Sequence, residues 1–346
     1  MTEKILSPAD ARLLDLLQTD IPLTETPWAW LGEKTALPPA EVLRRVSRFR
    51  AEGLIRRLGG IFDSRRLGYR GTLCAFRVPA ERVPAAAAVI NSYTGVTHNY
   101  IRRHEYNIWC TLLAPGEAEL ARLTEEMRAR VGGDKWLNLP VRRYFKVRVN
   151  FPLGTESVAR TAGPAEDDGE EDACFTGERE NAAAVAAGQT EFTREDKRLT
   201  AALQEALPLT ERPYATLAAG LSRREEDVLA VLRLWREQGI LKRVAAVLRH
   251  QLVGYSANAL AVWRIRPQET EAAGRRLAAR PEVTHCYERA VPSDWPYNMY
   301  TMLHAHSEEE CRALALDLAE LAGTEQYELL FSEAELKKSS MRYFLE

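Results

Sequence analysis

Two hydrophobic periods alternate along the first part of the chain, one typical of amphipathic helices and one typical of strands. The helical period covers residues 9–19, and a short tryptophan-rich helix is expected near 27–33. A further helix is predicted over 38–52, because its leading prolines suit a first turn and Gly53 ends it. Residues 54–62 then have strand character. Three helices followed by a short strand pair are typical of a winged helix-turn-helix.

The pattern then changes to strands and helices in alternation. The predicted order is strand 71–79, helix 80–92, strands 95–103 and 106–114, helix 116–131 and a last strand within 137–150. This β-α-β-β-α-β order is typical of a ferredoxin-like domain, in which helices cover one face of an antiparallel sheet. Such a sheet leaves its other face free for a ligand or a partner.

The second half of the chain repeats the first. Gly68-Tyr69, for example, recurs 186 positions later as Gly254-Tyr255. Ser222 is expected to cap a helix that runs through Gln238. The second ferredoxin-like unit is expected as strand 256–266, helix 268–280, strands 282–290 and 297–305, helix 307–322 and strand 325–331. The predicted fold class is therefore α+β, a tandem duplication whose copies pack as an intramolecular pseudo-dimer. Association of this pseudo-dimer into a larger homo-oligomer is left open.

One segment between the copies has a different composition. Residues 151–192 carry ten acidic residues against two arginines and have few apolar anchors. Such a segment cannot bury enough surface to offset its ordering entropy, so a flexible linker is predicted. The expected domains are winged helices at 1–66 and 193–251, ferredoxin-like domains at 67–150 and 252–346, and the acidic linker at 151–192.

Composition and charge narrow the classes of function. The 346 residues are 46% hydrophobic and 28% charged, which is ordinary for soluble globular domains. The net charge of -2 excludes a uniformly basic protein, and no apolar run approaches the ~18 residues of a membrane span. The charged N-terminal region does not resemble a signal peptide, so a cytoplasmic protein is expected. Five cysteines without a C-x-x-C pair argue against a disulfide framework or a zinc site.

Arginines gather on the predicted recognition helix and wing of the first copy. Residues 38–70 contain nine arginines against three acidic residues, an excess of positive charge that would attract phosphates. Alternatively, these arginines pair with acidic groups or line another anionic site. In the second copy the matching helix begins with Glu225, Glu226 and Asp227, which suit the helix dipole but repel DNA. Nucleic-acid binding is therefore disfavoured without being excluded.

A His-x-Tyr-x-Arg row occurs in the second strand of each ferredoxin-like unit. The rows are His98, Tyr100 and Arg102 in the first copy and His285, Tyr287 and Arg289 in the second. Alternate residues of a strand share one face, so each row places an acid/base, a phenol and a permanent cation together. His104 is a candidate continuation of the first row. No histidine, cysteine and aspartate cluster has metal-ligand spacing, so no metal site built by protein side chains alone is expected.

These segments carry a resemblance to known families. The winged helix followed by a ferredoxin-like unit resembles the Lrp/AsnC family of transcription regulators. The run His98-Asn99-Tyr100 with the residues from His104 to Leu112 resembles one subunit of the siroheme decarboxylases, which are Lrp/AsnC-like proteins. The run from His285 to Arg289 with Asp294 to Met302 resembles the other subunit. The likeness covers nearly all of both copies and leaves out only the linker.

The resemblance implies a carboxy-lyase, with two subunit types fused in one chain. Its expected reaction removes the carboxylates of the C12 and C18 acetate groups of siroheme and gives 12,18-didecarboxysiroheme, in alternative haem or haem d1 biosynthesis. No added cofactor is expected, because the iron tetrapyrrole is the substrate, although an axial histidine to its iron and a regulatory haem both fit the resemblance. The alternative is a DNA-binding transcription regulator of the Lrp/AsnC type, and a haem-sensing regulator is a further class that would share the pocket without turnover.

Candidate site residues follow from the chemistry of a polycarboxylate substrate. His98 and His104 are the expected proton donors of the main pocket, and Tyr100 is expected to orient the acetate or relay a proton. The second copy would complete the wall of this pocket or bind a second tetrapyrrole. Expected substrate contacts are Arg102, Arg103, Tyr106, Trp109, Arg142, Arg143, Lys146, His285, Tyr287, Arg289, Trp295 and Arg342, where the cations bind carboxylates and the aromatic rings contact the macrocycle.

Overall fold

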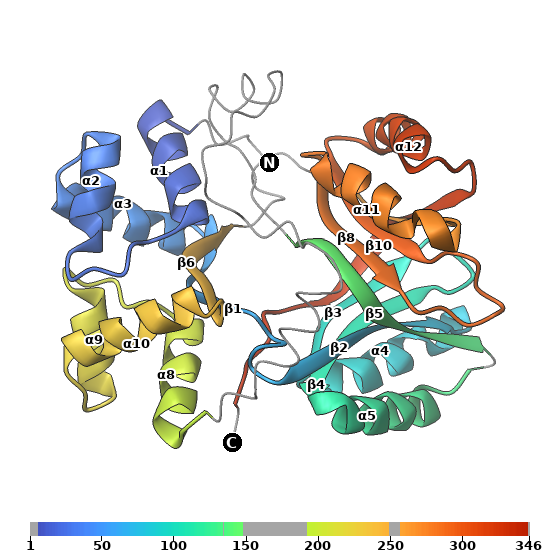
Figure 1. The fold of residues 1–346 in the computed structure, drawn as a ribbon, viewed down its shortest axis with the longest axis horizontal. Helices are drawn as coiled ribbons and strands as arrows, with labels where there is room; N and C mark the ends of the chain where they lie inside the picture. The colour runs from blue at the N-terminus through green and yellow to red at the C-terminus, as the bar shows by residue number, and fades with distance from the viewer. Residues whose placement is uncertain (1–5, 134, 148–191, 249–256, 345–346) are drawn as a thin grey trace.

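The computed structural model describes residues 6–133, 135–147, 192–248 and 257–344. These residues form two lobes, a helical lobe that holds the N-terminal part of each copy and a barrel lobe that holds the rest (Figure 1). The predicted acidic linker lies outside the described residues except for Phe192. No helix of the described ranges is long and apolar enough to cross a membrane.

The helical lobe contains three helices from each copy around one core. They are α1 (Pro8–Thr19), α2 (Pro27–Thr35), α3 (Pro39–Ala51), α8 (Arg194–Glu205), α9 (Pro213–Gly220) and α10 (Glu225–Glu237). Buried residues from both copies, such as Leu14, Phe49, Leu203 and Trp235, belong to a single hydrophobic cluster. The two helical units therefore fold as one body, which the amphipathic pattern of each unit alone does not reveal.

The expected strand pair within each winged helix is wrong. Strand β1 (Ile55–Phe62) instead pairs antiparallel with β6 (Leu241–Leu248) of the other copy. After Phe62 the chain turns through Asp63 and enters the barrel lobe, so no second strand of the same copy lies beside β1. Pairing across the copies satisfies the backbone groups that a lone strand leaves unpaired.

The expected helix cap at Ser222 is also wrong. Ser222 has a φ of 57° and belongs to the turn after α9, and α10 begins at Glu225 with Arg224 at its N-cap. A residue in the left-handed region cannot hold the extended backbone of an N-cap. Thr193 does cap α8, because its hydroxyl accepts the backbone N–H of Asp196 in a capping box.

The barrel lobe confirms the duplicated β-α-β-β-α-β order. The first copy supplies β2 (Tyr69–Arg77), α4 (Val83–Ser92), β3 (Val96–Arg102), β4 (Ile108–Pro115), α5 (Gly116–Val131) and β5 (Lys135–Val147). The second copy supplies β7 (Ala257–Trp263), α11 (Thr270–Ala279), β8 (Val283–Arg289), β9 (Met299–Ala305), α12 (Glu308–Ala322) and β10 (Tyr327–Lys338). Short 3₁₀ turns, Ala80–Arg82 and Pro267–Glu269, precede α4 and α11. The helices lie outside the strands (Figure 1).

The two sheets join into one closed barrel of strand order β10-β3-β4-β2-β5-β8-β9-β7. The last strand of each copy makes the connection. Strand β5 pairs with β2 of its own copy up to Pro140 and with β8 of the other copy from Val141 onward. Strand β10 likewise pairs with β7 up to Phe331 and with β3 from Ser332 onward. Closure removes the exposed sheet edges that two separate sheets would have.

This closure corrects two expectations. The free sheet face expected in each copy is the inside of the shared barrel, and the last strand of the second copy extends well past the expected end at residue 331. Its second half, from Ser332 to Lys338, pairs with β3 and consists mostly of polar residues, so its hydrophobic pattern does not mark it as a strand. One apolar cluster fills part of the interior with residues of both copies, among them Trp109, Leu139, Trp295 and Tyr300.

Candidate active site

The two His-x-Tyr-x-Arg rows lie inside the barrel and start at the same end. Neighbouring barrel strands are antiparallel, and β3 and β8 are four steps apart, so these two strands run in the same direction. In the first row the Tyr100 ring centroid lies 6.3 Å from the His98 ring and 5.3 Å from the Arg102 guanidinium. The second row repeats this arrangement with ring centroids of His285 and Tyr287 6.0 Å apart. The predicted sharing of one face is therefore confirmed in both copies.

A bulge holds each histidine at the start of its row. The pairing register shifts between Val96 and His98 and again between Val283 and His285. In both copies the preceding threonine takes part in a 3.0 Å hydrogen bond with Nδ1 of the histidine. These hydrogen bonds occupy Nδ1 and orient each ring, so that Nε2 is the nitrogen left for other chemistry.

Both histidines are neutral at physiological pH. Burial, together with the nearby His285, Lys338 and Arg56, lowers the pKa of His98 to about 3. Burial, together with the positive charge of Lys146, lowers the pKa of His285 to about 4. An anionic group at this end of the barrel would oppose these cations and raise both pKa values.

The arginines at the deep end of the rows have no carboxylate partner in the described part of the chain. Arg102 is 4% exposed and donates to the Leu330 carbonyl at 2.8 Å and to Ser332 Oγ at 3.1 Å. Arg289 is 7% exposed and donates to the Leu139 carbonyl at 2.7 Å. The Nε atom of each lacks a hydrogen-bond partner. A buried cation without a counterion is costly unless a ligand supplies the charge.

The carbonyls that accept these bonds also have a structural role. Leu139 and Leu330 lie next to the points where β5 and β10 leave their own sheet for the other copy. Arg102 and Arg289 therefore connect the copies where the ladder changes partner. This role uses one guanidinium nitrogen of each arginine and leaves the other donors available for an anion.

Several residues at the mouth of the barrel were not predicted as site residues. Arg56 of β1 and Lys338 of β10 act electrostatically on His98, and Arg65 lies 4.4 Å above the Tyr144 ring. The Tyr144 ring packs edge-on against Tyr287 at 5.4 Å. These groups come from the helical lobe, the segment after β1 and the last strands, and they lie far from the rows in the sequence.

His104 does not share a pocket with His98, contrary to expectation. His98 and Arg102 are about 13 Å apart along an extended strand, and His104 lies beyond Arg102. The Tyr106 backbone N–H donates to His104 Nδ1 at 3.0 Å, and His104 Nε2 lies 3.2 Å from Glu328. Both ring nitrogens therefore have protein partners at the opposite end of the barrel, because the chain turns away after β3.

An aromatic cluster closes that opposite end. The Trp295 ring lies edge-on to His104 at 5.6 Å and to Tyr106 at 5.5 Å, and its Nε1 donates to Tyr300 Oη at 2.6 Å. Trp109 is 1% exposed and donates to the Tyr106 carbonyl. The aromatic rings that were expected to contact a macrocycle thus contact one another instead. Trp295 comes from the insertion of the second copy and fills the barrel.

The remaining cations expected to bind substrate lie outside the barrel interior. Arg103 pairs with Glu308 and Glu333 on the surface, and Arg143 pairs with Glu271. The other three also lie apart from the rows: Arg142 is exposed, Lys146 donates to the Arg280 carbonyl, and Arg342 pairs with Glu205 of the helical lobe. Lys146 still acts electrostatically on His285.

The arginines of the candidate recognition helix α3 are paired with carboxylates. Arg45 lies 3.0 Å from Asp10 and 2.6 Å from Glu41, and Arg48 lies 2.8 Å from Asp10. Arg44 pairs with Glu41 as well. Their charge is largely compensated within the helical lobe. For these three arginines, the alternative that they pair with acidic groups is therefore supported over binding to phosphates.

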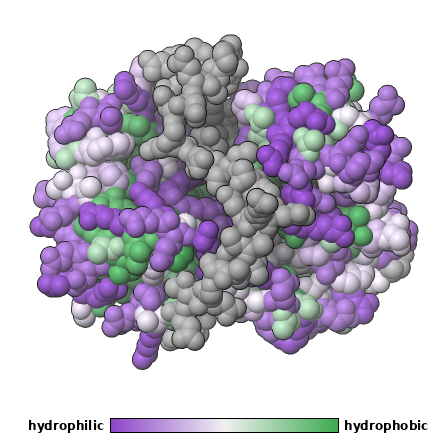
Figure 2. Space-filling view, viewed as in Figure 1, coloured by the Kyte–Doolittle hydropathy of each residue, from purple (hydrophilic) through white to green (hydrophobic). Residues whose placement is uncertain are grey.

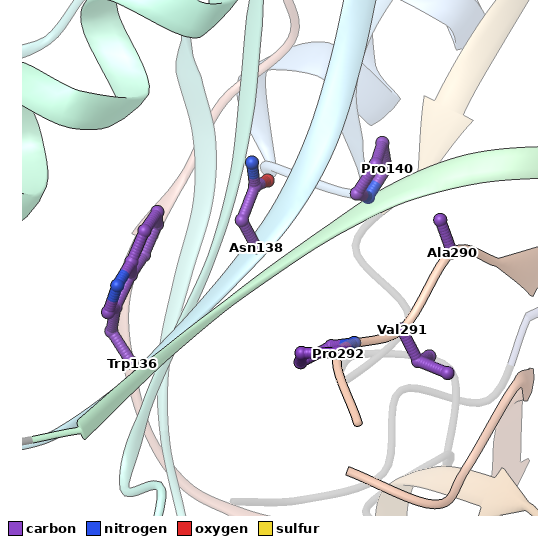
Figure 3. A pocket seen from close by; sticks show the side chains of 6 residues that line it. All are labelled: Trp136, Asn138, Pro140, Ala290, Val291 and Pro292. Atoms are coloured by element: carbon purple, nitrogen blue, oxygen red, sulfur yellow. The ribbon is translucent and has the colours of Figure 1, made fainter. Parts of the chain in front are cut away.

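A cavity of about 380 Å³ lies on the outside of the barrel, at the seam of β5 and β8. Its lining residues are Trp136, Asn138, Pro140, Ala290, Val291 and Pro292 (Figure 3). Asn138 is the one polar side chain among them, and it accepts a 2.6 Å hydrogen bond from Thr72. Without a titratable group this cavity offers no acid–base chemistry. Among the described residues, no group of three or more histidine, cysteine or acidic residues could hold a metal ion.

Comparisons with known proteins agree with this architecture. The profile of the AsnC-like ligand binding domain matches residues 66–146 and 252–337, and that of the siroheme decarboxylase NirDL-like HTH domain matches residues 10–56 and 196–241. Siroheme decarboxylase of Hydrogenobacter thermophilus is 34% identical over 97% of this chain and 95% of its own. The siroheme decarboxylase alpha subunit of Nitratidesulfovibrio vulgaris is 44% identical over 43% of this chain and 84% of its own.

A solved structure extends the comparison to three dimensions. The crystal structure of siroheme decarboxylase NirDL in complex with an iron-uroporphyrin III analogue is 30% identical, covers 98% of this chain and 95% of its own, and has a TM-score of 0.71. The separate alpha subunit corresponds to about half of the present chain, in agreement with a fusion of two subunit types. From its duplicated fold, its paired rows and these matches, the chain belongs to the siroheme decarboxylase family.

Proposed function

We propose that this protein is a siroheme decarboxylase whose substrate is held at the mouth of the barrel, between the two His-x-Tyr-x-Arg rows. The observation that carries the proposal is the pair of buried arginines, Arg102 and Arg289, which lack a carboxylate partner among the described residues. Siroheme is a polycarboxylate, and its acetate groups would supply the missing charge. The related NirDL binds an iron-uroporphyrin III analogue, which supports a tetrapyrrole in this role.

The expected reaction replaces each of two acetate carboxylates by a proton. The bond between the methylene and the carboxylate carbon breaks, CO2 leaves, and the electron pair is delocalised into the macrocycle. A proton donor then completes a methyl group. The conjugated macrocycle accepts the electron pair, so no additional organic cofactor is required. We assign the two sites of reaction to the C12 and C18 acetates.

Row residues divide these tasks by their chemistry. Arg102 and Arg289 are suited to bind carboxylates because a guanidinium offers several fixed donors. His98 is neutral in the free protein, and a substrate carboxylate beside it would raise its pKa toward the range of a general acid. We favour His98 over His104, because both ring nitrogens of His104 contact protein groups.

The test is anaerobic incubation of the protein with siroheme, followed by mass analysis of the tetrapyrrole. The expected product has lost two CO2 units. Replacement of His98 by Gln should slow CO2 loss at least tenfold, whereas Arg142→Ala, a change of an exposed arginine, should not. A wild-type protein that binds siroheme and returns it unchanged would contradict the proposal.

A regulator remains the competing function, and its signature is different. A DNA-binding protein should bind random duplex with an affinity that falls steeply as salt is raised. The ion pairs of Arg45 and Arg48 with Asp10 leave fewer cations on α3 for phosphates. We therefore expect weak duplex binding that siroheme does not change.

A further inference from the structure

The two rows are similar along their own strands but differ in what faces them. Tyr100 faces Glu335 of β10, and its hydroxyl donates to Glu335 Oε2 at 3.3 Å. Tyr287 faces the ring of Tyr144 of β5, at the equivalent point of the other seam. Within the described residues, the first row therefore has a carboxylate at its phenol and the second row has a ring.

Glu335 connects a buried group with water. Tyr100 is 9% exposed, while the Glu335 side chain is 40% exposed. Lys338 Nζ lies 3.8 Å from Glu335 Oε2 and pairs with the same carboxylate oxygen that accepts the Tyr100 hydroxyl. A proton can thus pass between solvent and the phenol through one carboxylate, without opening of the barrel.

The other groups that face Tyr100 leave it protonated at rest. Burial raises the pKa of Tyr100, and the neighbouring Glu335 raises it further. The facing groups are His98 and Arg102 on its own strand, Trp109 on β4, Glu335 and Lys338 on β10, and Arg56 on β1. The positive charges of Arg102 and Arg56 lower the pKa of Tyr100 and would stabilise a phenolate once the proton has left.

We propose that Glu335 is a positioning residue that reloads Tyr100 with protons from solvent between successive decarboxylations. This inference rests on the proposed function. Each siroheme consumes two protons, while Tyr100 holds one. In each step the C–C bond breaks, CO2 leaves, and the methylene carbon takes a proton from His98. Tyr100, whose ring stacks on His98, returns a proton to the histidine, and the resulting phenolate regains one from water through Glu335.

The proposal predicts an unusual time course for Glu335→Gln. Tyr100 starts protonated in this variant, so the first CO2 should leave each protein at the wild-type rate. Later CO2 should leave at least tenfold more slowly, and monodecarboxylated siroheme should accumulate. Rapid mixing with siroheme and mass analysis of the tetrapyrrole separate the first event from later ones. A role in folding or in substrate binding would instead slow the first event as well.

Control variants make the outcome specific. Glu333→Gln removes an exposed carboxylate two residues away on the same strand, which pairs with Arg103, and should behave as wild type. Glu335→Asp keeps the carboxylate and should restore part of the later rate. Tyr100→Phe should abolish the fast first event, and the double variant Tyr100→Phe/Glu335→Gln should be no slower, because both changes interrupt one path.

The two levels of inference can fail separately. Wild-type protein that releases no CO2 from siroheme would contradict the proposed function. Wild-type activity together with an unchanged later rate in Glu335→Gln, or with an equally slowed first event, would overturn the role of Glu335 and leave the proposed function intact.

Discussion

At the scale of single residues, the barrel combines neutral histidines with buried cations. His98 and His285 carry depressed pKa values because they are buried beside lysine and arginine side chains. Arg102 and Arg289 lie deeper and contact carbonyls and aromatic rings in place of carboxylates. Such an interior stores positive potential that an anionic ligand can use. The duplication places this arrangement twice around one axis.

The buried arginines should matter more for ligand binding than for folding. Replacement of Arg102 or Arg289 by Met removes a buried charge without a counterion and keeps much of the volume, so the free energy of unfolding should change by less than about 2 kcal/mol. Affinity for an iron uroporphyrin should fall at least tenfold, because a charged hydrogen bond to a carboxylate is lost. Denaturant unfolding and absorbance titration measure the two quantities. A large loss of stability with unchanged affinity would show that these arginines only connect the copies.

Acid should destabilise the folded protein through the two histidines. Their folded-state pKa values lie below the ordinary value, so the unfolded chain binds more protons between about pH 4 and 6.5. The stability that neutral rings maintain above this window is lost as the pH falls, by about 1.4 kcal/mol per pH unit for each ring. Between pH 7 and pH 5, the free energy of unfolding should therefore fall by about 2 kcal/mol less in His98→Gln or His285→Gln than in the wild type. An equal loss in both variants and wild type would contradict these pKa values.

At the scale of elements, the last strands and the insertion of the second copy shape the site. Strands β5 and β10 each divide their length between two sheets, and this division closes the barrel. The insertion after β8 contributes Trp295, which fills the end of the barrel opposite the histidines. An element that the first copy lacks therefore makes the interior asymmetric.

Trp295 should be a major contributor to the stability of the barrel. It is 5% exposed and packs against Tyr106, Trp109 and Tyr300. Trp295→Ala leaves a cavity and should lower the free energy of unfolding by about 3–5 kcal/mol. Trp30→Ala is the matched control, because Trp30 is 37% exposed on α2, and it should cost much less. Equal effects of the two changes on denaturant unfolding would show that the cluster is loosely packed.

At the scale of the whole molecule, both lobes are shared between the copies. The helical lobe has one hydrophobic cluster from both, and the barrel closes only with strands of both. The surface drawn in Figure 2 is mostly hydrophilic, with a hydrophobic area on the helical lobe. Because the contacts between copies are part of each core, we expect the copies to unfold together.

Separation of the copies tests this dependence. Residues 1–150 and 193–346, produced as separate chains, should each be unfolded or aggregated alone and should combine one to one when produced together. The reason is that each half alone leaves two sheet edges and half of a core exposed. Circular dichroism and sedimentation of each half and of the mixture check the outcome. A half that is monomeric and cooperatively folded by itself would contradict the shared core.

Local pattern alone determined the duplication, the element order and the two rows, because these depend on the period of hydrophobic residues and on the alternation of side chains along a strand. The placement of His98 apart from His104, the pairing of β1 with β6 and the contact of Tyr100 with Glu335 were decided only by the tertiary structure. The pairing of β1 with β6 and the contact of Tyr100 with Glu335 join residues that lie far apart in the chain. The separation of the two histidines depends on where the chain leaves β3. Barrel closure is the physical reason, since it brings the end of each copy to the row of the other.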